Sequence, residues 1–432
     1  MHISQQIAAN AVNQVLSGRN LTLALPAALA SFPAATPQQR GAAADLSYGT
    51  LRFYGEINAY LTGLLEKPLT DDRIYSLLLV AIYQLLHDKA DAFTVVNQAV
   101  YAVSQLKKPS PKSWAKGLVN AILRNFLRKQ TQLADLVRKS ELGLYSYPQW
   151  WISKLKTQYP QHWESMLTAG NQHPPMTLRV NTKKISVEDY LRLLERQDIE
   201  ASHIGGQAVL LVKPLMVEKI PGFNDGIVSV QDYGAQLAAH LLDLQSGMRV
   251  LDACAAPGGK TGHILELCDV QLTAIDNDEL RLQRVQNNLT RLQLTADLAV
   301  GDAASADWHH GQPFDRILAD VPCTASGIVR RHVDIKWLRR EQDIKSFAAQ
   351  QAKILPNLWQ LLAKGGKLLY VTCSVFNEEN QEQVNKFLSQ HPDAKQLELP
   401  SQVFSSAVSQ LHGQLIPSTA HDGFFYALLQ KN

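Results

Sequence analysis

The chain has 432 residues, of which 46% are hydrophobic and 19% are charged, and its formal net charge is +3. This is an ordinary globular composition without low-complexity tracts, and the length predicts two or three domains. The charge is uneven: residues 1–150 carry 15 Lys and Arg against 9 Asp and Glu, whereas the remainder carries 27 against 30. A basic first third indicates either a polyanionic partner or simply a solvated surface.

Residues 1–140 are predicted to form an all-α helical bundle, because apolar residues recur at helical spacing and strand patterns are scarce. The periodic segments are "RIYSLLLVAIYQLL" (73–86), "VVNQAVYAVSQL" (95–106) and "WAKGLVNAILRNFLR" (114–128), with "KKPSPKS" (107–113) as a break. The inward face of the last segment is expected to consist of Trp114, Leu118, Ala121, Ile122 and Phe126.

Four basic residues lie at multiples of four along this last segment: Lys112, Lys116, Arg124 and Arg128. Residues at this spacing stay broadly on one side of a helix. They form either a solvated face or a stripe that contacts phosphates.

Residues 141–232 are predicted to form a small α/β module, with strands in "PPMTLRVNTKK" and "GQAVLLVKP" and a helix in "YLRLLERQDI" between them. From residue 233 to 432, predicted strands and helices alternate, which is typical of a doubly wound, Rossmann-like α/β domain with a parallel sheet. The final segment, "HDGFFYALLQ", is expected to add a strand at an edge of this sheet.

A turn of small residues, "VLDACAAPGGKTGHI", joins a predicted strand of this last domain to a helix. Such turns let a ligand approach the backbone at the start of the helix. The turn resembles neither common nucleotide-binding loop fully. Cys254 replaces the first glycine of a P-loop, and Pro257, with its fixed negative φ, replaces the first glycine of the dinucleotide fingerprint.

Each of four successive predicted strands ends at or near an aspartate: Asp252, Asp276, Asp302 and Asp320. In a doubly wound sheet these strand ends line the ligand crevice, and an acid about 20 residues after the glycine turn suits ribose hydroxyls. Several acids would repel phosphates but suit a cationic nucleoside such as S-adenosylmethionine. The alternative is that they are turn and N-cap residues.

The four cysteines lie in the last two-fifths of the chain, and no CxxC pair occurs, so neither a metal site nor a redox dithiol is expected. Cys254 and Cys268 are expected to be buried packing residues. Cys323 and Cys373 each follow a predicted strand, and if those strands are neighbours both thiols can face one pocket. Asn377 is expected to cap a helix beginning at Glu378, whose amides would favour the Cys373 thiolate.

The motifs "DACAAPGGKT", "DVPCTASGIVRRHVDIKW" and "YVTCSVFNEEN" resemble the signatures of RNA cytosine-5 methyltransferases. In the first 140 residues, "NQAVYAVSQL" and "KGLVNAILRNF" resemble a NusB-like RNA-binding domain. The resemblance covers nearly the whole chain; one departure is that Thr324 and Ala325 reverse the family's order of small residues.

The resemblance implies that Cys373 is the nucleophile, that Cys323 assists release of the adduct and that Asp320 activates the base. It places S-adenosylmethionine against Asp276, Asp302, Asp320 and the turn formed by Cys254, Ala255, Ala256, Pro257, Gly258, Gly259 and Lys260. Lys260 could equally be a surface lysine in the first turn of a helix. From the residues alone, the choice of attacking cysteine stays open.

The implied substrate is 16S ribosomal RNA, either free or partly assembled, in the cytoplasm. Arg330, Arg331, His332 and Lys336 could grip the RNA backbone beside a flipped base, or form an ordinary basic loop. No metal and no membrane partner are expected, since the apolar stretch 21–35 is interrupted by prolines and too short to span a bilayer. Nothing in the sequence demands more than a monomer.

Two other functions remain open at this point. One is a DNA or tRNA cytosine-5 methyltransferase with similar chemistry. The other is a non-catalytic RNA-binding factor that retains an inactive methyltransferase domain, although the presence of both cysteines and all the aspartates counts against it.

Overall fold

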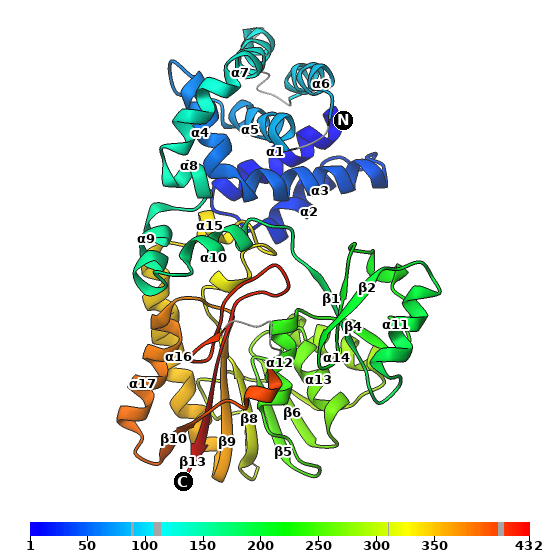
Figure 1. Ribbon diagram of the computed structural model, residues 1–432, viewed down its shortest axis with the longest axis vertical. Coiled ribbons are helices and arrows are strands. Elements are labelled where there is room, and N and C mark those ends of the chain that lie inside the picture. The colour runs from blue at the N-terminus through cyan, green and yellow to red at the C-terminus, as the bar shows by residue number, and fades with distance from the viewer. Residues whose placement is uncertain (88–89, 107–113, 310, 405–409) are drawn as a thin grey trace. The chain divides into compact units, whose positions relative to one another are not determined.

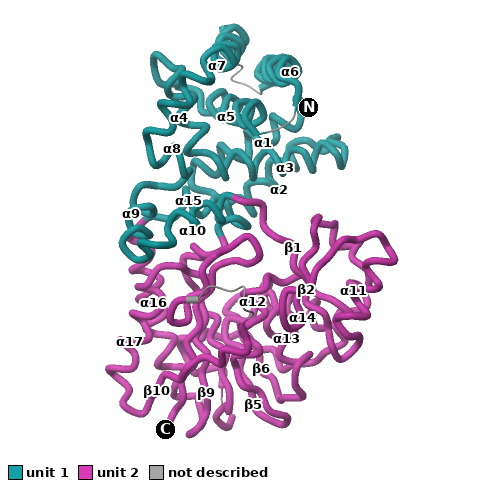
Figure 2. Tube along the Cα trace, in the orientation of Figure 1, with its two compact units in different colours: residues 1–171, 329–340 teal, residues 172–328, 341–432 magenta. Residues whose placement is uncertain are grey.

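The computed structural model describes residues 1–432 except 88–89, 107–113, 310 and 405–409. The chain divides into two compact units, each built from two stretches of sequence (Figure 2). Unit 1 contains residues 1–171 and 329–340, and unit 2 contains residues 172–328 and 341–432. Lys112 and the predicted break at 107–113 lie outside the described residues.

Unit 1 is all-α in its described part, as the apolar periodicity predicts (Figure 1). Its helices are α1 (His2–Leu16), α2 (Leu21–Ala30), α3 (Pro37–Arg52), α4 (Tyr54–Leu64), α5 (Asp72–His87), α6 (Ala92–Ser104), α7 (Trp114–Arg138), α8 (Glu141–Tyr145), α9 (Gln149–Gln158), α10 (Trp163–Gly170) and α15 (Ile335–Leu338). Local signals fix some boundaries. For example, Thr36 and Gln39 form a reciprocal capping box at the start of α3, which satisfies two amides that a helix start leaves unpaired.

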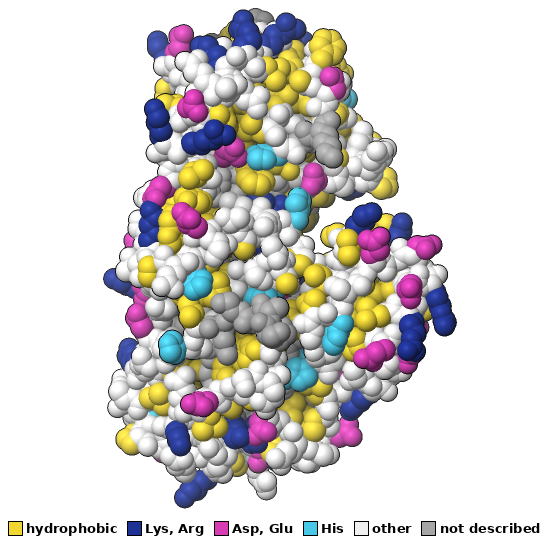
Figure 3. Space-filling model, viewed as in Figure 1, with side chains coloured by type: hydrophobic (Ala, Val, Ile, Leu, Met, Phe, Trp, Pro, Cys, Tyr) yellow, Lys and Arg dark blue, Asp and Glu magenta, His cyan; other side chains and the backbone are white. Residues whose placement is uncertain are grey.

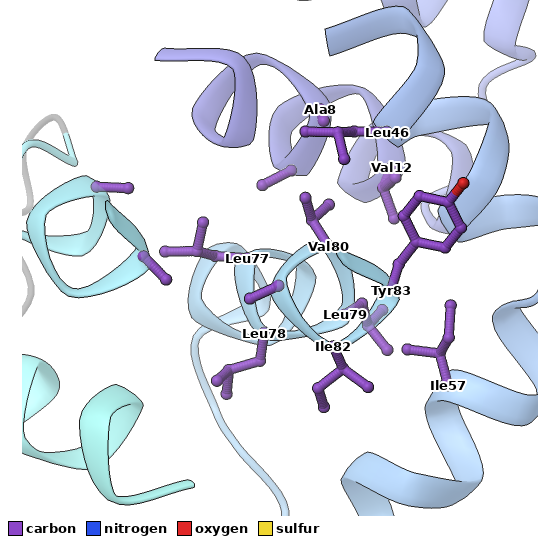
Figure 4. Close-up of a cluster of buried hydrophobic side chains, with 14 of the residues drawn as sticks. Ala8, Val12, Leu46, Ile57, Leu77, Leu78, Leu79, Val80, Ile82 and Tyr83 are labelled. Carbon is purple, nitrogen blue, oxygen red and sulfur yellow. The ribbon is translucent and has the colours of Figure 1, made fainter. Parts of the chain in front are cut away.

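Helix α5 lies at the centre of the unit 1 core. Figure 4 shows its side chains pointing in several directions, toward residues of α1, α3 and α4. A helix that is apolar on most sides must be surrounded by other helices, which is why this segment forms the middle of the bundle. The core residues labelled in that view are Ala8, Val12, Leu46, Ile57, Leu77, Leu78, Leu79, Val80, Ile82 and Tyr83, and all are buried.

The inward face predicted for α7 is only partly correct. Ile122 and Phe126 are buried, but the side chain of Trp114 is 50% exposed and Ala121 is also exposed. Trp114 instead lines a surface groove of about 700 Å³ between α7 and the loop that follows α4. Helical periodicity identified the helix but assigned too wide an apolar face to it.

The first unit extends to residue 171, beyond the predicted boundary at 140. Helix α8 packs on α4, where the backbone N–H of Glu56 donates to Ser146 Oγ at 3.0 Å. Segment 329–340 also joins unit 1. There Lys336 Nζ donates to the Arg52 carbonyl at 2.6 Å, and Trp337 Nε1 donates to the Leu51 carbonyl at 2.7 Å.

Unit 2 begins with a four-stranded antiparallel sheet that carries helix α11 (Val187–Glu195). The strand order is β2–β3–β1–β4. The strands are β1 (Met176–Val180), β2 (Ala201–Gly205), β3 (Ala208–Leu211) and β4 (Val228–Val230). This is the small α/β module expected from the alternation of strand and helix patterns.

The larger sheet of unit 2 has the order β11–β12–β13–β9–β8–β5–β6–β7, and β10 also pairs with β13. Strands β9, β8, β5, β6 and β7 are parallel to one another. The strands are β5 (Arg249–Ala253), β6 (Gln271–Asp276), β7 (Asp297–Val300), β8 (Phe314–Asp320), β9 (Leu362–Thr372), β10 (Ala394–Leu397), β11 (Gln410–Leu411), β12 (Gln414–Leu415) and β13 (Phe424–Lys431). The helices are α12 (Tyr233–Leu241), α13 (Gly259–Leu267), α14 (Glu279–Leu292), α16 (Glu341–Leu361) and α17 (Gln381–Gln390).

Helices cover both faces of this sheet, which confirms the doubly wound architecture (Figure 1). Alternate residues of a strand reach opposite layers: Val250 packs in the core with α12, α13 and α14, whereas Leu251 packs in the core with α16 and α17. The sheet is mixed, because β13 runs antiparallel to β9. The prediction that β13 lies at an edge is wrong, since it pairs with β9 on one side and with β10 and β12 on the other.

Candidate active site

A cleft of about 380 Å³ opens at the carboxyl ends of the parallel strands of unit 2. This volume falls within the range of small-molecule sites. The cleft is lined by Cys254, Ala256, Asp276, Asn277, Arg281, Gly301, Asp302, Ala303, Asp320, Val321, Pro322, Cys323, Gln350, Ile354 and Cys373. Seven of the residues predicted from sequence are therefore brought together: Cys254, Ala256, Asp276, Asp302, Asp320, Cys323 and Cys373.

The glycine turn joins β5 to α13 and forms one wall of the cleft through Cys254 and Ala256. Two positive-φ residues allow its sharp bend, Cys254 (φ 64°) and Gly258 (φ 94°). A Cβ at Gly258 would lie 3.1 Å from the backbone of Val285, so glycine also permits close packing against α14. Ala255, Pro257, Gly258 and Gly259 shape this turn but do not line the cleft.

Asp276, at the end of β6, is held in a fixed position at the floor of the cleft. Its carboxylate accepts from the backbone N–H groups of Ala256 and Asp278, both at 3.2 Å. Arg281, from the first turn of α14, approaches the same carboxylate at 3.4 Å. Asp302 lies on the cleft after β7, where it is exposed and accepts from the N–H of Ala304.

Asp252 is the predicted acid that does not reach the cleft. It is fully buried beneath the turn, where its Oδ2 accepts from Thr261 Oγ1 at 2.7 Å. Burial, reinforced by the charges of Asp320 and Asp276, raises the pKa of Asp252 to about 7. Its position indicates that it supports the start of α13 and does not contact a ligand directly.

Lys260 pairs with Asp320 at 2.6 Å and is mostly buried, so it is not an ordinary surface lysine. Its Nζ also lies 5.5 Å from the centre of the Phe424 ring. Burial alone would lower the pKa of Lys260, but the carboxylate of Asp320 outweighs it and leaves this pKa raised. The pair places a fixed carboxylate and a fixed ammonium beside the thiols.

The two cysteines meet as expected, because β8 and β9 are neighbouring parallel strands with Asp320 opposite Val371. The Sγ atoms of Cys323 and Cys373 lie 3.4 Å apart. The hydrogen bond to Cys373 raises the pKa of Cys323 well above its usual value, and burial adds to this. The raised pKa favours the protonated form of Cys323, and either sulfur can be the donor in the contact between the two thiols.

The expected helix start after Cys373 is wrong. Residues Asn377–Glu379 form a short 3₁₀ turn that follows Phe376, and α17 begins only at Gln381. Asn377 therefore caps no helix. Glu379, expected in the first turn of that helix, lies in the 3₁₀ turn and is fully buried.

The basic residues expected to contact RNA fall into two groups. Lys116, Arg124 and Arg128 are exposed on α7, and Figure 3 shows Lys and Arg side chains gathered over the part of unit 1 that contains this helix. Arg330 and Lys336 are instead buried within unit 1, which corrects the expectation that they grip phosphates. Lys336 Nζ is held by the Arg52 carbonyl and by Asn171 Oδ1 at 2.8 Å. Arg331 is half-buried and His332 exposed.

Sequence patterns missed several residues of the site. Arg281 could have been found, since it lies in the first turn of the helix that follows Asp276. Gln350 and Ile354 come from α16, which lies outside every motif quoted above, so no local signal identifies them. Arg179 was also missed. Its guanidinium, fully buried on β1, donates to the Gly259 carbonyl at 2.7 Å and forms two bonds with Glu266, both at 2.7 Å.

Within the described residues, no cluster of three or more His, Cys, Asp or Glu side chains could hold a metal ion. Across the same part of the chain, no helix combines the length and apolar character needed to cross a membrane.

Comparison with known proteins assigns the fold to the class of S-adenosylmethionine-dependent methyltransferases. The chain belongs to the family of 16S rRNA methyltransferases RsmB/F, whose model matches residues 239–430. A model for the ferredoxin-like domain of these enzymes matches residues 147–218, and a NusB family model matches residues 2–128. These matches confirm the predicted family and the NusB-like character of the helical bundle.

A relative from Pseudomonas putida, "Ribosomal RNA small subunit methyltransferase B", is 42% identical over 98% of this chain and 97% of its own length. Among solved structures, PH0851 is 25% identical, with a TM-score of 0.80 over 100% of this chain and 99% of its own. NSun6 from Pyrococcus horikoshii, solved with SFG, is 20% identical and shares the fold of 67% of this chain and 99% of its own, with a TM-score of 0.59.

S-adenosylmethionine is the cofactor of this methyltransferase class, and the residues of the cleft fit it. Three carboxylates, of Asp276, Asp302 and Asp320, border a space of suitable size. Acceptors of this kind suit ribose hydroxyls, an amino group and a sulfonium charge. The turn presents only the small side chains of Cys254 and Ala256 to this space, which leaves room for a ligand beside the backbone.

Proposed function

We propose that this protein transfers a methyl group from S-adenosylmethionine to C5 of a cytosine in 16S ribosomal RNA, through a covalent adduct between a cysteine and C6 of the base. The observation that carries the proposal is the pair of thiols 3.4 Å apart at the mouth of the methyltransferase cleft, beside Asp320. Methylation of a ring or exocyclic nitrogen would need no thiol, because nitrogen already has a lone pair.

Carbon 5 of cytosine is a poor nucleophile, so the reaction needs covalent activation. Addition of a thiolate to C6 makes C5 enamine-like, and C5 can then take the methyl group. Removal of the C5 proton restores the double bond as the C6–S bond breaks and the thiolate leaves. This route splits one difficult step into two easier ones.

The structure favours distinct roles for the two cysteines. The raised pKa of Cys323 favours its protonated form, which supports Cys373 as the thiol that attacks C6, the role that the family resemblance implies. After methyl transfer, Cys323 is adjacent to the adduct and can assist its breakdown. We assign to Asp320, which pairs with Lys260 and lines the same cleft, the role of holding the protonated N3 of the activated base.

RNA is the substrate that the rest of the chain favours. The exposed Lys116, Arg124 and Arg128 offer phosphate contacts on a helical NusB-like unit. A base must leave its stack to reach thiols at the mouth of a cleft. A DNA or tRNA substrate would use the same chemistry, and a non-catalytic RNA-binding role would leave the paired thiols, Lys260 and the acids without use.

The proposal is tested with radiolabelled S-adenosylmethionine and unmethylated 16S ribosomal RNA, with tRNA and DNA as competitors. We expect label at C5 of a single cytosine in the ribosomal RNA alone. We expect Cys323→Ala to accumulate a covalent RNA adduct and Cys373→Ala to form none and be inactive. Cys268→Ala, which removes a thiol remote from the cleft, is the control and should remain active.

Other outcomes are equally clear. An adduct on Cys373→Ala but not on Cys323→Ala would reverse the roles. Transfer to a nitrogen or a ribose hydroxyl would disprove the covalent route, and RNA binding without transfer would support the non-catalytic alternative.

A further inference from the structure

A single buried carboxylate, that of Glu379, connects the two loops that carry the reactive cysteines. Its Oε1 accepts from the backbone N–H of Thr324 at 2.7 Å. Its Oε2 accepts from Thr324 Oγ1 at 2.6 Å and from Ser374 Oγ at 2.5 Å. Glu379 is fully buried and does not line the cleft, so it touches neither cofactor nor substrate.

Both of these donors directly follow a cysteine: Thr324 follows Cys323, and Ser374 follows Cys373. The carboxylate therefore acts one residue away from both sulfurs. Two further bonds join the same loops. The N–H of Gly327 donates to the Cys373 carbonyl at 2.8 Å, and the N–H of Val375 donates to Ser326 Oγ at 2.9 Å.

Glu379 itself is held by the strand that ends at Cys373. The hydroxyl of Tyr370 donates to the Glu379 carbonyl at 2.7 Å. The neighbouring Asn380 accepts from Thr372 Oγ1 at 2.5 Å and donates to the Ser374 carbonyl at 3.0 Å. A carboxylate fixed in this way can impose its position on the loop that it binds.

The charge of Glu379 also reaches the thiols. The pKa of Cys323 is raised first by its hydrogen bond to Cys373, then by burial, and the nearby carboxylate of Glu379 adds to the rise. A buried carboxylate is costly unless its oxygens are bonded, and three of the bonds to Glu379 come from the two cysteine loops. These bonds tie the position of each loop to the same carboxylate.

We propose that Glu379 is a positioning residue that sets the separation of the Cys323 and Cys373 thiols. The effect of Glu379 on catalysis rests on the proposed function, but its effect on the separation of the two thiols can be tested without RNA. Reactive groups displaced by about 1 Å can lose roughly 100-fold in rate, so a group that fixes two thiols at contact distance controls turnover.

The direct test measures how fast the two thiols oxidise to a disulfide with diamide. In this reaction the two thiols give up two hydrogens to the N=N bond of diamide, which becomes a hydrazine as the S–S bond forms. Disulfide formation is followed by mass spectrometry of the peptides that contain Cys323 and Cys373. Neither RNA nor cofactor takes part, so this readout does not depend on the proposed reaction.

The variants are Glu379→Gln, Glu379→Asp and Glu379→Ala, with Glu398→Gln as the matched control at an exposed glutamate. We expect the wild type and the control to form the disulfide at equal rates and Glu379→Ala at least about tenfold more slowly. Glu379→Asp keeps the charge but is one methylene shorter, and Glu379→Gln offers an N–H₂ in place of one acceptor, so both should be intermediate.

The second measurement is turnover. We expect Glu379→Ala to lower kcat by about 10- to 100-fold, while the dissociation constant for S-adenosylmethionine stays unchanged because the cleft is not touched. Equal rates of disulfide formation in all variants would overturn the proposal. So would parallel losses of cofactor affinity, thermal stability and kcat, since these would show a purely structural role. Unaltered turnover by a fully folded Glu379→Ala would also refute it.

A failure of the proposed function looks different. In that case the wild type would not methylate C5 of cytosine, yet Glu379→Ala would still slow disulfide formation between Cys323 and Cys373.

Discussion

Replacing Arg179 with Met should strongly destabilise unit 2. Arg179 is fully buried on β1, and its Nε and Nη2 form a two-bond ion pair with Glu266 of α13. Its Nη1 donates to Gln231 Oε1 at 2.6 Å and to the Gly259 carbonyl at 2.7 Å. The substitution preserves much of the side-chain volume but leaves the Glu266 carboxylate buried without its cation.

The magnitude follows from that unpaired charge. Breaking a buried ion pair by removing one partner costs about 3–5 kcal/mol. For a unit of this size such a loss lowers the Tm by about 6–20 °C. Cofactor affinity should fall as well, because Arg179 holds the first carbonyl of α13 where the glycine turn ends.

The assay is thermal unfolding followed by circular dichroism, together with calorimetric titration of S-adenosylmethionine. Arg192→Met is the matched control, because Arg192 and Asp189 form an exposed ion pair at 2.8 Å. Such pairs contribute about 0–1 kcal/mol, so the control should barely change the Tm. The double variant Arg179→Met/Glu266→Leu should recover most of the lost stability, since it removes both charges. If Arg179→Met lowers the Tm no more than Arg192→Met does, the buried pair does not stabilise the connection between β1 and the start of α13.

Two further predictions concern charge in other parts of the chain. Asp252 has a pKa raised from 3.8 to about 7 by burial, so the folded state binds a proton more tightly than the unfolded state. Its stabilising contribution is complete below pH 4 and is lost as the pH rises through 7. The unfolding free energy of Asp252→Asn should therefore decline less than that of the wild type between pH 5 and 8. Identical pH profiles of the unfolding free energy in the two proteins would contradict this. Arg124→Ala and Arg128→Ala should each weaken RNA binding and reduce the salt slope of the binding constant by about 0.7–1, whereas Lys336→Met should lower the Tm without changing that slope. The slope is measured by filter binding across salt concentrations. A reduced slope for Lys336→Met would show that this lysine does contact phosphate.

Much of the fold could be predicted because its signals are local. The helices around α5 follow from apolar residues at helical spacing, and the strands of the large sheet follow from short apolar runs that end in aspartate. The meeting of Cys323 and Cys373 was also predictable, since parallel neighbouring strands end at the same edge of a sheet.

What could not be predicted depends on partners distant in sequence. Placing β13 inside the sheet requires knowing that it pairs antiparallel with β9 and also with β10 and β12. The burial of Lys336 depends on Arg52 and Asn171, which lie more than 160 residues away along the chain. A motif indicates which residues could take part in the reaction or in binding. It does not say whether a basic side chain is exposed to solvent or bonded to a buried carbonyl.

Three buried polar side chains account for how the chain holds the parts that form the proposed site. Arg179 bonds the Gly259 carbonyl where the glycine turn ends, Glu379 connects the two cysteine loops, and Lys336 anchors the segment that follows the Cys323 loop within unit 1. Apolar side chains of similar volume would stabilise such positions equally well or better. A buried polar side chain, however, requires partners in fixed directions, so it restricts the arrangement of its neighbours. Because the proposed reaction needs two sulfurs and a methyl donor aligned at contact distance, we infer that these side chains are retained for the geometry they impose and not for the stability they add.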